Sequence, residues 1–226
     1  MLNPIHAIKQ LYTLDIANAS TTLGISREVI EQHESELGIQ LPPMLYHYLH
    51  ELGNGDFNTH YHHFVELPFE KLDDYVVIGK TCDDDGVWGI ALKDLSQHDP
   101  MVMMSRNFDA IEPSEVHWFK ELPLSAFLLA QAIINGVNGG LAHHAQVYDF
   151  AGDTIPHDLA DKLVNLTTEI DELHRPHERY FHAPTLDGED FGVAMVVSVD
   201  EDRPTAFLMG SQHQGLFEQW IQQLLD

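Results

Sequence analysis

The sequence has one cysteine, few basic residues and no long apolar run. Cys82 is alone among 226 residues, so no internal disulfide can form. No apolar run approaches the ~20 residues that a membrane-spanning helix needs. The first 20 residues contain Lys9 inside their apolar part, which is unlike the continuous apolar segment of a signal peptide. These absences predict a protein in a reducing, cytoplasmic setting, without a signal peptide or an anchor.

Positive charge is scarce throughout the chain. The sequence has 11 Lys and Arg against 36 Asp and Glu, a formal net charge of -25 at pH 7. Residues 1–140 carry 20 acidic and 7 basic residues, and residues 141–226 carry 16 and 4, so the excess is not confined to a tail. Such a field repels nucleic acid and anionic lipid and speeds the encounter with a basic protein. We therefore expect neither a nucleic acid nor a membrane as partner, although solubility or adaptation to salt explains the same charge.

Motifs of catalysis and cofactor binding are missing as well. The sequence has no G-x-S-x-G motif and no phosphate-binding loop, and NGVNGG at 135–140 lacks the lysine of such a loop. Cys82 precedes three aspartates, which disfavour a reactive thiolate. We expect no catalytic residues, no cofactor and no enzymatic activity.

Histidines are abundant, at 16, and chance clusters are expected. His60, His62 and His63 lie close to Glu66, but a zinc site needs further ligands and a supporting shell, and no HExxH motif occurs. We interpret the histidines as structural or surface residues and predict no metal site. A His/Asp metal-dependent hydrolase is a minor alternative, which metal analysis of the purified protein would decide.

Local patterns in the first 140 residues predict the order α-α-β-β-β-α. Residues 26–37 form a helix between the N-cap Ser26 and Gly38. The next helix follows Pro42 and Pro43, carries an apolar stripe at i, i+3, i+4 and i+7, and ends at Gly53, which we expect in the left-handed conformation. The apolar runs at 75–79, 87–92 and 101–105 predict an antiparallel meander, and 124–134 predicts a buried helix.

A second unit is predicted after a boundary near 135–144. A stripe of leucines and one isoleucine predicts a helix from Leu159 to Leu173. Runs at 178–183, 191–199 and 204–210 predict strands, and the spacing from Phe217 to Leu224 predicts a final helix. We therefore predict domains at 1–140 and 141–226, the latter an α-β-β-β-α extension or second subdomain.

The stretch ELGIQLPPMLYHYLHELGNG, residues 36–55, resembles the Smi1/Knr4 family, also called the SUKH superfamily. The pattern is E-x-x-LGI-x-LP, then an amphipathic helix that ends in GNG. The matching residues are Glu34, Leu37, Gly38, Ile39, Leu41, Pro42, Tyr48, Leu49, Asn54 and Gly55. The order of the elements downstream also agrees, so the resemblance covers about residues 24–140. Every residue in the stretch also has a sufficient structural role, so we interpret it as a fingerprint.

The resemblance implies an α+β fold, with helices on a mainly antiparallel sheet, and no catalytic apparatus. Most bacterial members of the family are immunity proteins, which bind and neutralise a toxin, commonly a nuclease, of a polymorphic or contact-dependent system. The implied partner is a basic toxin domain; the alternative is a regulatory or scaffold protein without a toxin. Our candidate partner-binding residues are Asp73, Asp74, Asp83, Asp84 and Asp85, because they lie in the part of the chain that carries the resemblance, although CDDDG at 82–86 also fits a solvated hairpin turn.

Three tryptophans occur in predicted elements. We expect Trp88, Trp118 and Trp220 to pack in the core, because large aromatic side chains dominate protein interiors. An exposed Trp118 beside Phe119 would instead be a candidate hot spot for a protein partner.

Overall fold

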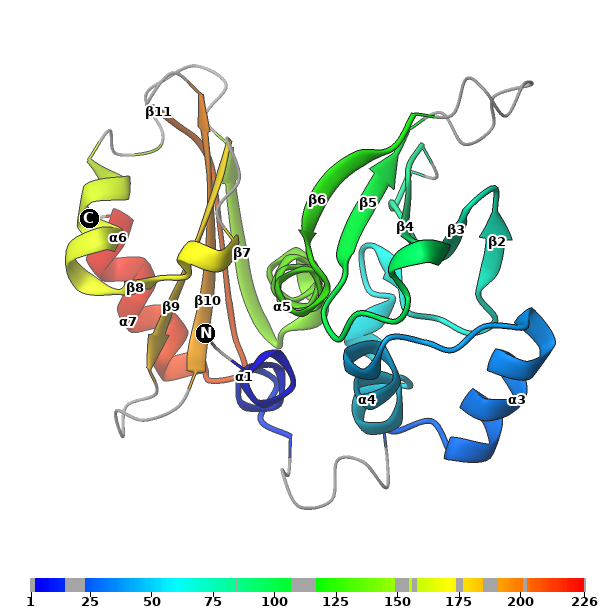
Figure 1. Ribbon diagram of the computed structural model, residues 1–226. Coiled ribbons are helices and arrows are strands. Elements are labelled where there is room, and N and C mark those ends of the chain that lie inside the picture. Colours follow the sequence, from blue (N-terminus) through cyan, green and yellow to red (C-terminus); the bar gives the residue numbers. More distant parts are fainter. Residues whose placement is uncertain are drawn as a thin grey trace. The chain divides into compact units, whose positions relative to one another are not determined.

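The computed structural model describes residues 3–14, 23–83, 85–106, 117–148, 155, 158–173, 177–184, 191–200 and 203–225. The chain divides into two compact units (Figure 1). Asp15–Gln131 form one, which we call the central unit because of its place in the sequence. Met1–Leu14 and Ala132–Asp226 together form the other, the terminal unit. Each unit combines helices with an antiparallel sheet, so the α+β class is as predicted.

The division differs from the predicted boundary after residue 140. It falls inside helix α5 (Leu124–Asn135), after Gln131, and residues 1–14 belong with the C-terminal part. The reason is that helix α1 (Pro4–Leu11) packs against strand β10 (Phe191–Asp200). The hydroxyl of Tyr12 also donates a 2.8 Å hydrogen bond to the carbonyl of Ala132. The central unit is thus an insertion between two segments of the terminal unit.

The central unit contains a six-stranded antiparallel sheet. Its order is β1-β3-β4-β5-β6, and β2 pairs with β3 beside β1. The strands are β1 (His63–Phe64), β2 (Glu70–Leu72), β3 (Tyr75–Lys80), β4 (Val87–Ala91), β5 (Met101–Ser105) and β6 (Phe119–Pro123). The predicted meander is confirmed as β3-β4-β5. Strands β1, β2 and β6 were not predicted; β1 and β2 are too short to show an alternating pattern.

Helices α3 (Arg27–Leu37), α4 (Pro43–Leu52) and the first part of α5 complete the central unit. The hydroxyl of Ser26 caps α3 by accepting from the amide of Val29 at 3.4 Å, as predicted. The apolar stripe of α4 is fully buried. Short 3-10 turns, η1 (Asp56–Asn58) and η2 (Leu92–Asp94), follow α4 and β4. The prediction for both helices is therefore confirmed.

The expected left-handed conformation of Gly53 is wrong. Gly53 is right-handed, with φ -61° and ψ -24°. A Cβ atom at this position would lie 2.6 Å from Cδ1 of Ile25 and 2.7 Å from the carbonyl oxygen of Leu49. Glycine is needed here because the preceding loop approaches the helix closely, and not because of the sign of φ.

The terminal unit contains a five-stranded antiparallel sheet in the order β7-β11-β10-β9-β8. The strands are β7 (His143–Tyr148), β8 (Thr168–Glu169), β9 (Glu178–Pro184), β10 and β11 (Arg203–Ser211). Helices α6 (Leu159–Leu166) and α7 (Gln214–Leu225) share one apolar core with the sheet, in which Leu163, Trp220 and Phe207 are buried. Helix α1 and the segment η4 (Gly136–Gly140) also contact the sheet. The three strands from β9 to β11 and the final helix are as predicted.

The predicted helix through Leu173 is too long. Helix α6 ends at Leu166, and the chain continues as β8 and a 3-10 turn, η5 (Asp171–Leu173). The amide of Ile170 donates to the carbonyl of Tyr180 at 2.8 Å, so this segment joins the sheet. Ile170 and Leu173 are buried as the stripe suggests, but from a different backbone conformation. Among the residues placed by the structure, no helix is both long and apolar enough to cross a membrane.

Candidate functional site

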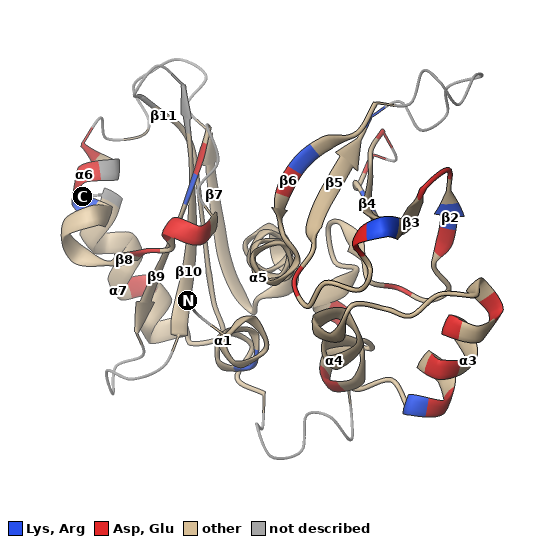
Figure 2. Ribbon diagram, viewed as in Figure 1, with Lys and Arg blue, Asp and Glu red and all other residues tan. Residues whose placement is uncertain are grey.

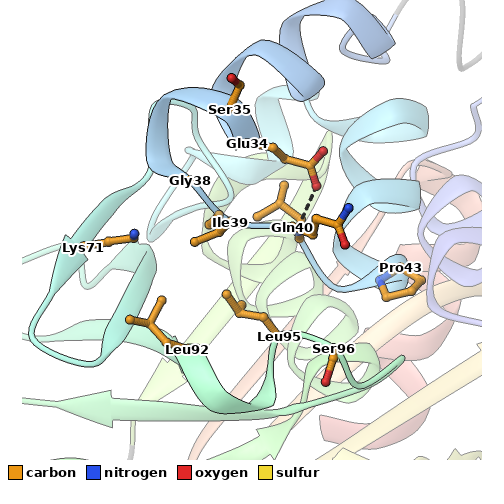
Figure 3. A pocket seen from close by; sticks show the side chains of 11 residues that line it. Glu34, Ser35, Gly38, Ile39, Gln40, Pro43, Lys71, Leu92, Leu95 and Ser96 are labelled. Carbon is orange, nitrogen blue, oxygen red and sulfur yellow. Dashed lines mark hydrogen bonds between the residues drawn. The ribbon is translucent and has the colours of Figure 1, made fainter.

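Residues Gly38–Leu41 and Pro43 line a groove in the central unit (Figure 3). The groove has a volume of about 930 Å³, at the upper end of the range of about 300–1,000 Å³ for ligand pockets. Three segments form its walls: the end of α3 with the loop before α4, strand β2, and η2 with the residues after it. The lining residues are Glu34, Ser35, Gly38, Ile39, Gln40, Leu41, Pro43, Lys71, Leu92, Leu95 and Ser96.

The charged side chains of the groove are engaged by the backbone. Glu34 Oε1 accepts from the amide of Leu41 at 2.7 Å, which holds the loop against α3. Lys71 Nζ donates to the carbonyl of Leu37 at 2.6 Å, at the C-terminal end of α3, where the helix dipole favours a cation. In Figure 3, Lys71, Ile39 and Leu92 surround the same part of the groove. Apolar side chains therefore make much of the surface that remains for a ligand.

Gly38 ends α3 in the left-handed conformation at the wall of the groove. Its φ is +63°, and an added Cβ would meet nothing within 4 Å. We therefore expect Gly38→Ala to lower the free energy of unfolding by about 1 kcal/mol, from backbone strain alone. Urea denaturation measures this loss. Gly38→Asn is the control, with a smaller loss because asparagine tolerates this conformation; equal losses would contradict the explanation.

Asp73 and Asp74 adjoin the groove. They form the turn between β2 and β3, both are exposed, and Asp73 has a φ of +51°. The carbonyl of Asp74 accepts a 2.7 Å hydrogen bond from the amide of Leu92, which lines the groove. Acidic residues of α3 and of this turn are coloured red in Figure 2. Two of the five candidate residues thus lie beside this groove.

Asp83 and Asp85 lie at the opposite end of β3, in the turn before β4. A six-residue strand is about 20 Å long, so the structure does not bring these residues to Asp73 and Asp74. Both are exposed, and the Thr81 hydroxyl organises the turn by donating to Asp85 Oδ1 at 3.2 Å. Hydrogen bonding within this turn, from Thr81 first, lowers the pKa of Asp83. Asp84 lies outside the described residues.

His62 and His63 make separate contacts and do not converge on one point. His63 Nδ1 lies 2.9 Å from Glu66 Oε2, and both side chains are exposed. His62 Nδ1 instead accepts from the amide of Cys82 at 3.1 Å, and its ring meets Trp88 edge to face at 5.1 Å. Within the described ranges, no group of three or more His, Cys, Asp or Glu is placed to hold a metal ion.

The aromatic predictions are confirmed in part. Trp88 and Trp220 are buried, as expected. Trp118 is half-buried and stacks on Tyr75, with ring centroids 4.0 Å apart, and covers the open backbone of Gly89. Phe119 beside it is 63% exposed at the start of the edge strand β6. Phe119, rather than Trp118, is therefore the exposed aromatic residue of this pair.

The groove itself was not predicted. Its walls come from segments about 30 and 50 residues apart in sequence, and Leu92 and Leu95 show no local sign of joining Ile39. One signal was available, because the fingerprint residues Gly38, Ile39 and Leu41 are also lining residues.

Comparison with models of known protein families, with curated proteins and with solved structures found no match. The resemblance of residues 24–140 to the Smi1/Knr4 family therefore stays a prediction.

Proposed function

We propose that this chain is a non-enzymatic Smi1/Knr4-type protein that acts as a cytoplasmic immunity protein. It binds and neutralises a basic toxin domain of a bacterial polymorphic or contact-dependent system, commonly a nuclease. The observation that carries the proposal is the net charge of -25 on a folded chain that presents exposed acids on ordered elements beside a groove. A nuclease needs a basic surface for phosphates, and an acidic inhibitor is complementary to that surface.

The physical advantage of such a charge is speed. Electrostatic steering raises association rates by about 10- to 1,000-fold at low salt. An antidote competes with the damage that the toxin does in its own cell, so a high association rate is useful. Acidic residues outnumber basic residues in both units, so the whole chain contributes to attracting a basic partner. The contact itself needs a defined surface.

The test is rescue of cells by co-expression. The gene next to the one for this chain is expressed from an inducible promoter, with and without this chain. We expect toxicity without the chain and growth with it, and an association rate of the purified pair that falls steeply with ionic strength. Binding without toxicity would indicate a regulatory or scaffold role instead. An association rate that is independent of salt would show that the charge does not steer the encounter.

A further inference from the structure

We infer that the groove lined by Gly38–Leu41, Lys71, Leu92, Leu95 and Ser96 is the docking site for a partner segment that carries an apolar side chain between basic residues. The inference rests on the proposed function, because it names the recognition by which a basic partner would be held. It differs from the first interpretation of the fingerprint, which gave residues 36–55 a structural role alone. The groove lies between α3, β2 and η2 (Figure 3).

The surface of the groove selects an apolar group. Ile39 and Leu92 are only half-buried, and Leu41 and Leu95 complete the apolar part beneath them. The two charged lining residues, Glu34 and Lys71, already bond to backbone groups, so a charged ligand would have to compete with those bonds. Burial of one leucine-sized side chain strengthens binding by roughly 10- to 100-fold. The apolar side chain therefore supplies much of the contact energy.

The surroundings of the groove select positive charge next to that apolar group. The three wall segments, 28–43, 70–74 and 92–96, contain eight acidic and two basic residues. One of the two bases, Lys71, is held by the end of α3. Glu31, Glu36, Asp73 and Asp74 are exposed. An extended segment places successive residues about 3.3 Å apart, so long lysine or arginine side chains next to the apolar anchor can extend toward the acids of these wall segments.

The occupant is a protein segment and not a small metabolite. At about 930 Å³ the groove admits several residues of an extended chain. The lining offers no cluster of free charged groups that would orient a small ion. The wall segments also carry the exposed acids Glu31, Glu36, Asp73 and Asp74. A protein segment that carries both apolar and basic side chains matches the apolar lining and these acids at once.

The experiment uses synthetic peptides and the full-length protein labelled with ¹⁵N. The first peptide has one leucine flanked on each side by two lysines; the second has serine in place of leucine; the third has glutamates in place of the lysines. Amide shifts in two-dimensional NMR spectra report the place and affinity of binding. We expect saturable shifts at residues 38–41 and 92–96 with the first peptide, and a roughly 10- to 100-fold weaker affinity for the second.

Substitutions identify the groove. Leu92→Glu should weaken binding of the first peptide at least tenfold, although it makes the protein more negative. Val164→Glu changes the charge equally at an exposed apolar position of α6 and should leave the affinity unchanged. Ser96→Arg fills the groove from an exposed position, so it tests the same surface if Leu92→Glu disturbs folding. Gln219→Arg on α7, also exposed, is its charge-matched control.

Each outcome bears on the inference. Equal binding of the leucine and serine peptides, with shifts spread over acidic surfaces, would overturn the groove but leave a charge-steered partner intact. Stronger binding of the glutamate peptide would overturn the assignment of a basic segment. Absence of binding by all three peptides would also overturn the inference, whereas rescue by co-expression tests the proposed function separately. Loss of binding in Val164→Glu equal to that in Leu92→Glu would remove the assignment to this groove.

Discussion

Replacement of Asn58 by alanine is expected to lower the free energy of unfolding by about 2–4 kcal/mol. Asn58 is 1% exposed, in the turn η1 after α4. Its Oδ1 accepts from the hydroxyl of Tyr48 at 2.8 Å, and its Nδ2 donates to the carbonyls of Leu52 and Gly53 at 2.9 and 3.2 Å. The side-chain amide of Asn58 thus hydrogen-bonds both to the C-terminal end of α4 and to the buried hydroxyl of Tyr48. Its loss removes a hydrogen-bond partner from three polar groups at a buried site.

The matched control is Asn54→Ala. Asn54 is exposed, and its Nδ2 makes one hydrogen bond, to the carbonyl of Gly24 at 3.0 Å. Water replaces that bond, so we expect a loss below about 1 kcal/mol. Urea denaturation followed by circular dichroism measures both variants. If Asn58→Ala cost no more than Asn54→Ala, the buried network would not hold the end of α4.

Phe127→Ala is expected to cost about 3–5 kcal/mol. Phe127 is fully buried on α5, and its ring meets Trp88 and Phe64 edge to face, with centroids 5.5 and 6.4 Å away. These contacts fasten α5 to the sheet of the central unit. Removal of the ring leaves a cavity beside Trp88, so tryptophan fluorescence should report the loss in a denaturation experiment.

The same substitution at Phe119 is the control for Phe127→Ala. Phe119 is 63% exposed, and truncation of an exposed side chain changes stability by about 0.5 kcal/mol or less. A similar cost at both positions would mean that burial of the Phe127 ring does not stabilise the central unit. Phe127→Leu should recover much of the loss, because it refills part of the volume.

Sequence patterns correctly predicted the helices that are determined by nearby residues, through capping and apolar spacing. Helix α3 lies between a cap at Ser26 and a left-handed Gly38, and the stripe of α4 is buried as its spacing indicates. Gly53 shows the limit of this reasoning, because its need for glycine comes from the approach of Ile25, more than 25 residues earlier. Helix α6 shows a second limit. The apolar spacing continues past Leu166, but pairing with β9 overrides it.

For the candidate site too, the sequence predicted the local features and not the contacts between distant segments. The acidic turns are visible in the sequence, and the structure places Asp73, Asp74, Asp83 and Asp85 at exposed positions. Sequence alone could not tell that β3 separates the two turns or that Leu92 links one of them to the loop at Ile39. Such relations depend on strand pairing and on a hydrogen bond across about 20 residues, and neither has a local signature.

The insertion of one unit into another has a consequence for the order of folding during synthesis. The ribosome completes helix α1 at residue 11, but the strand against which it packs, β10, is complete only at residue 200. At a synthesis rate of about 5–20 residues per second, this helix waits roughly 10 to 40 s for its strand. During that time Ile5, Ile8 and Leu11, buried in the finished protein, have no native sheet to cover them. The central unit is fully synthesised once residue 131 has been added, so we expect it to fold while the terminal unit is still incomplete.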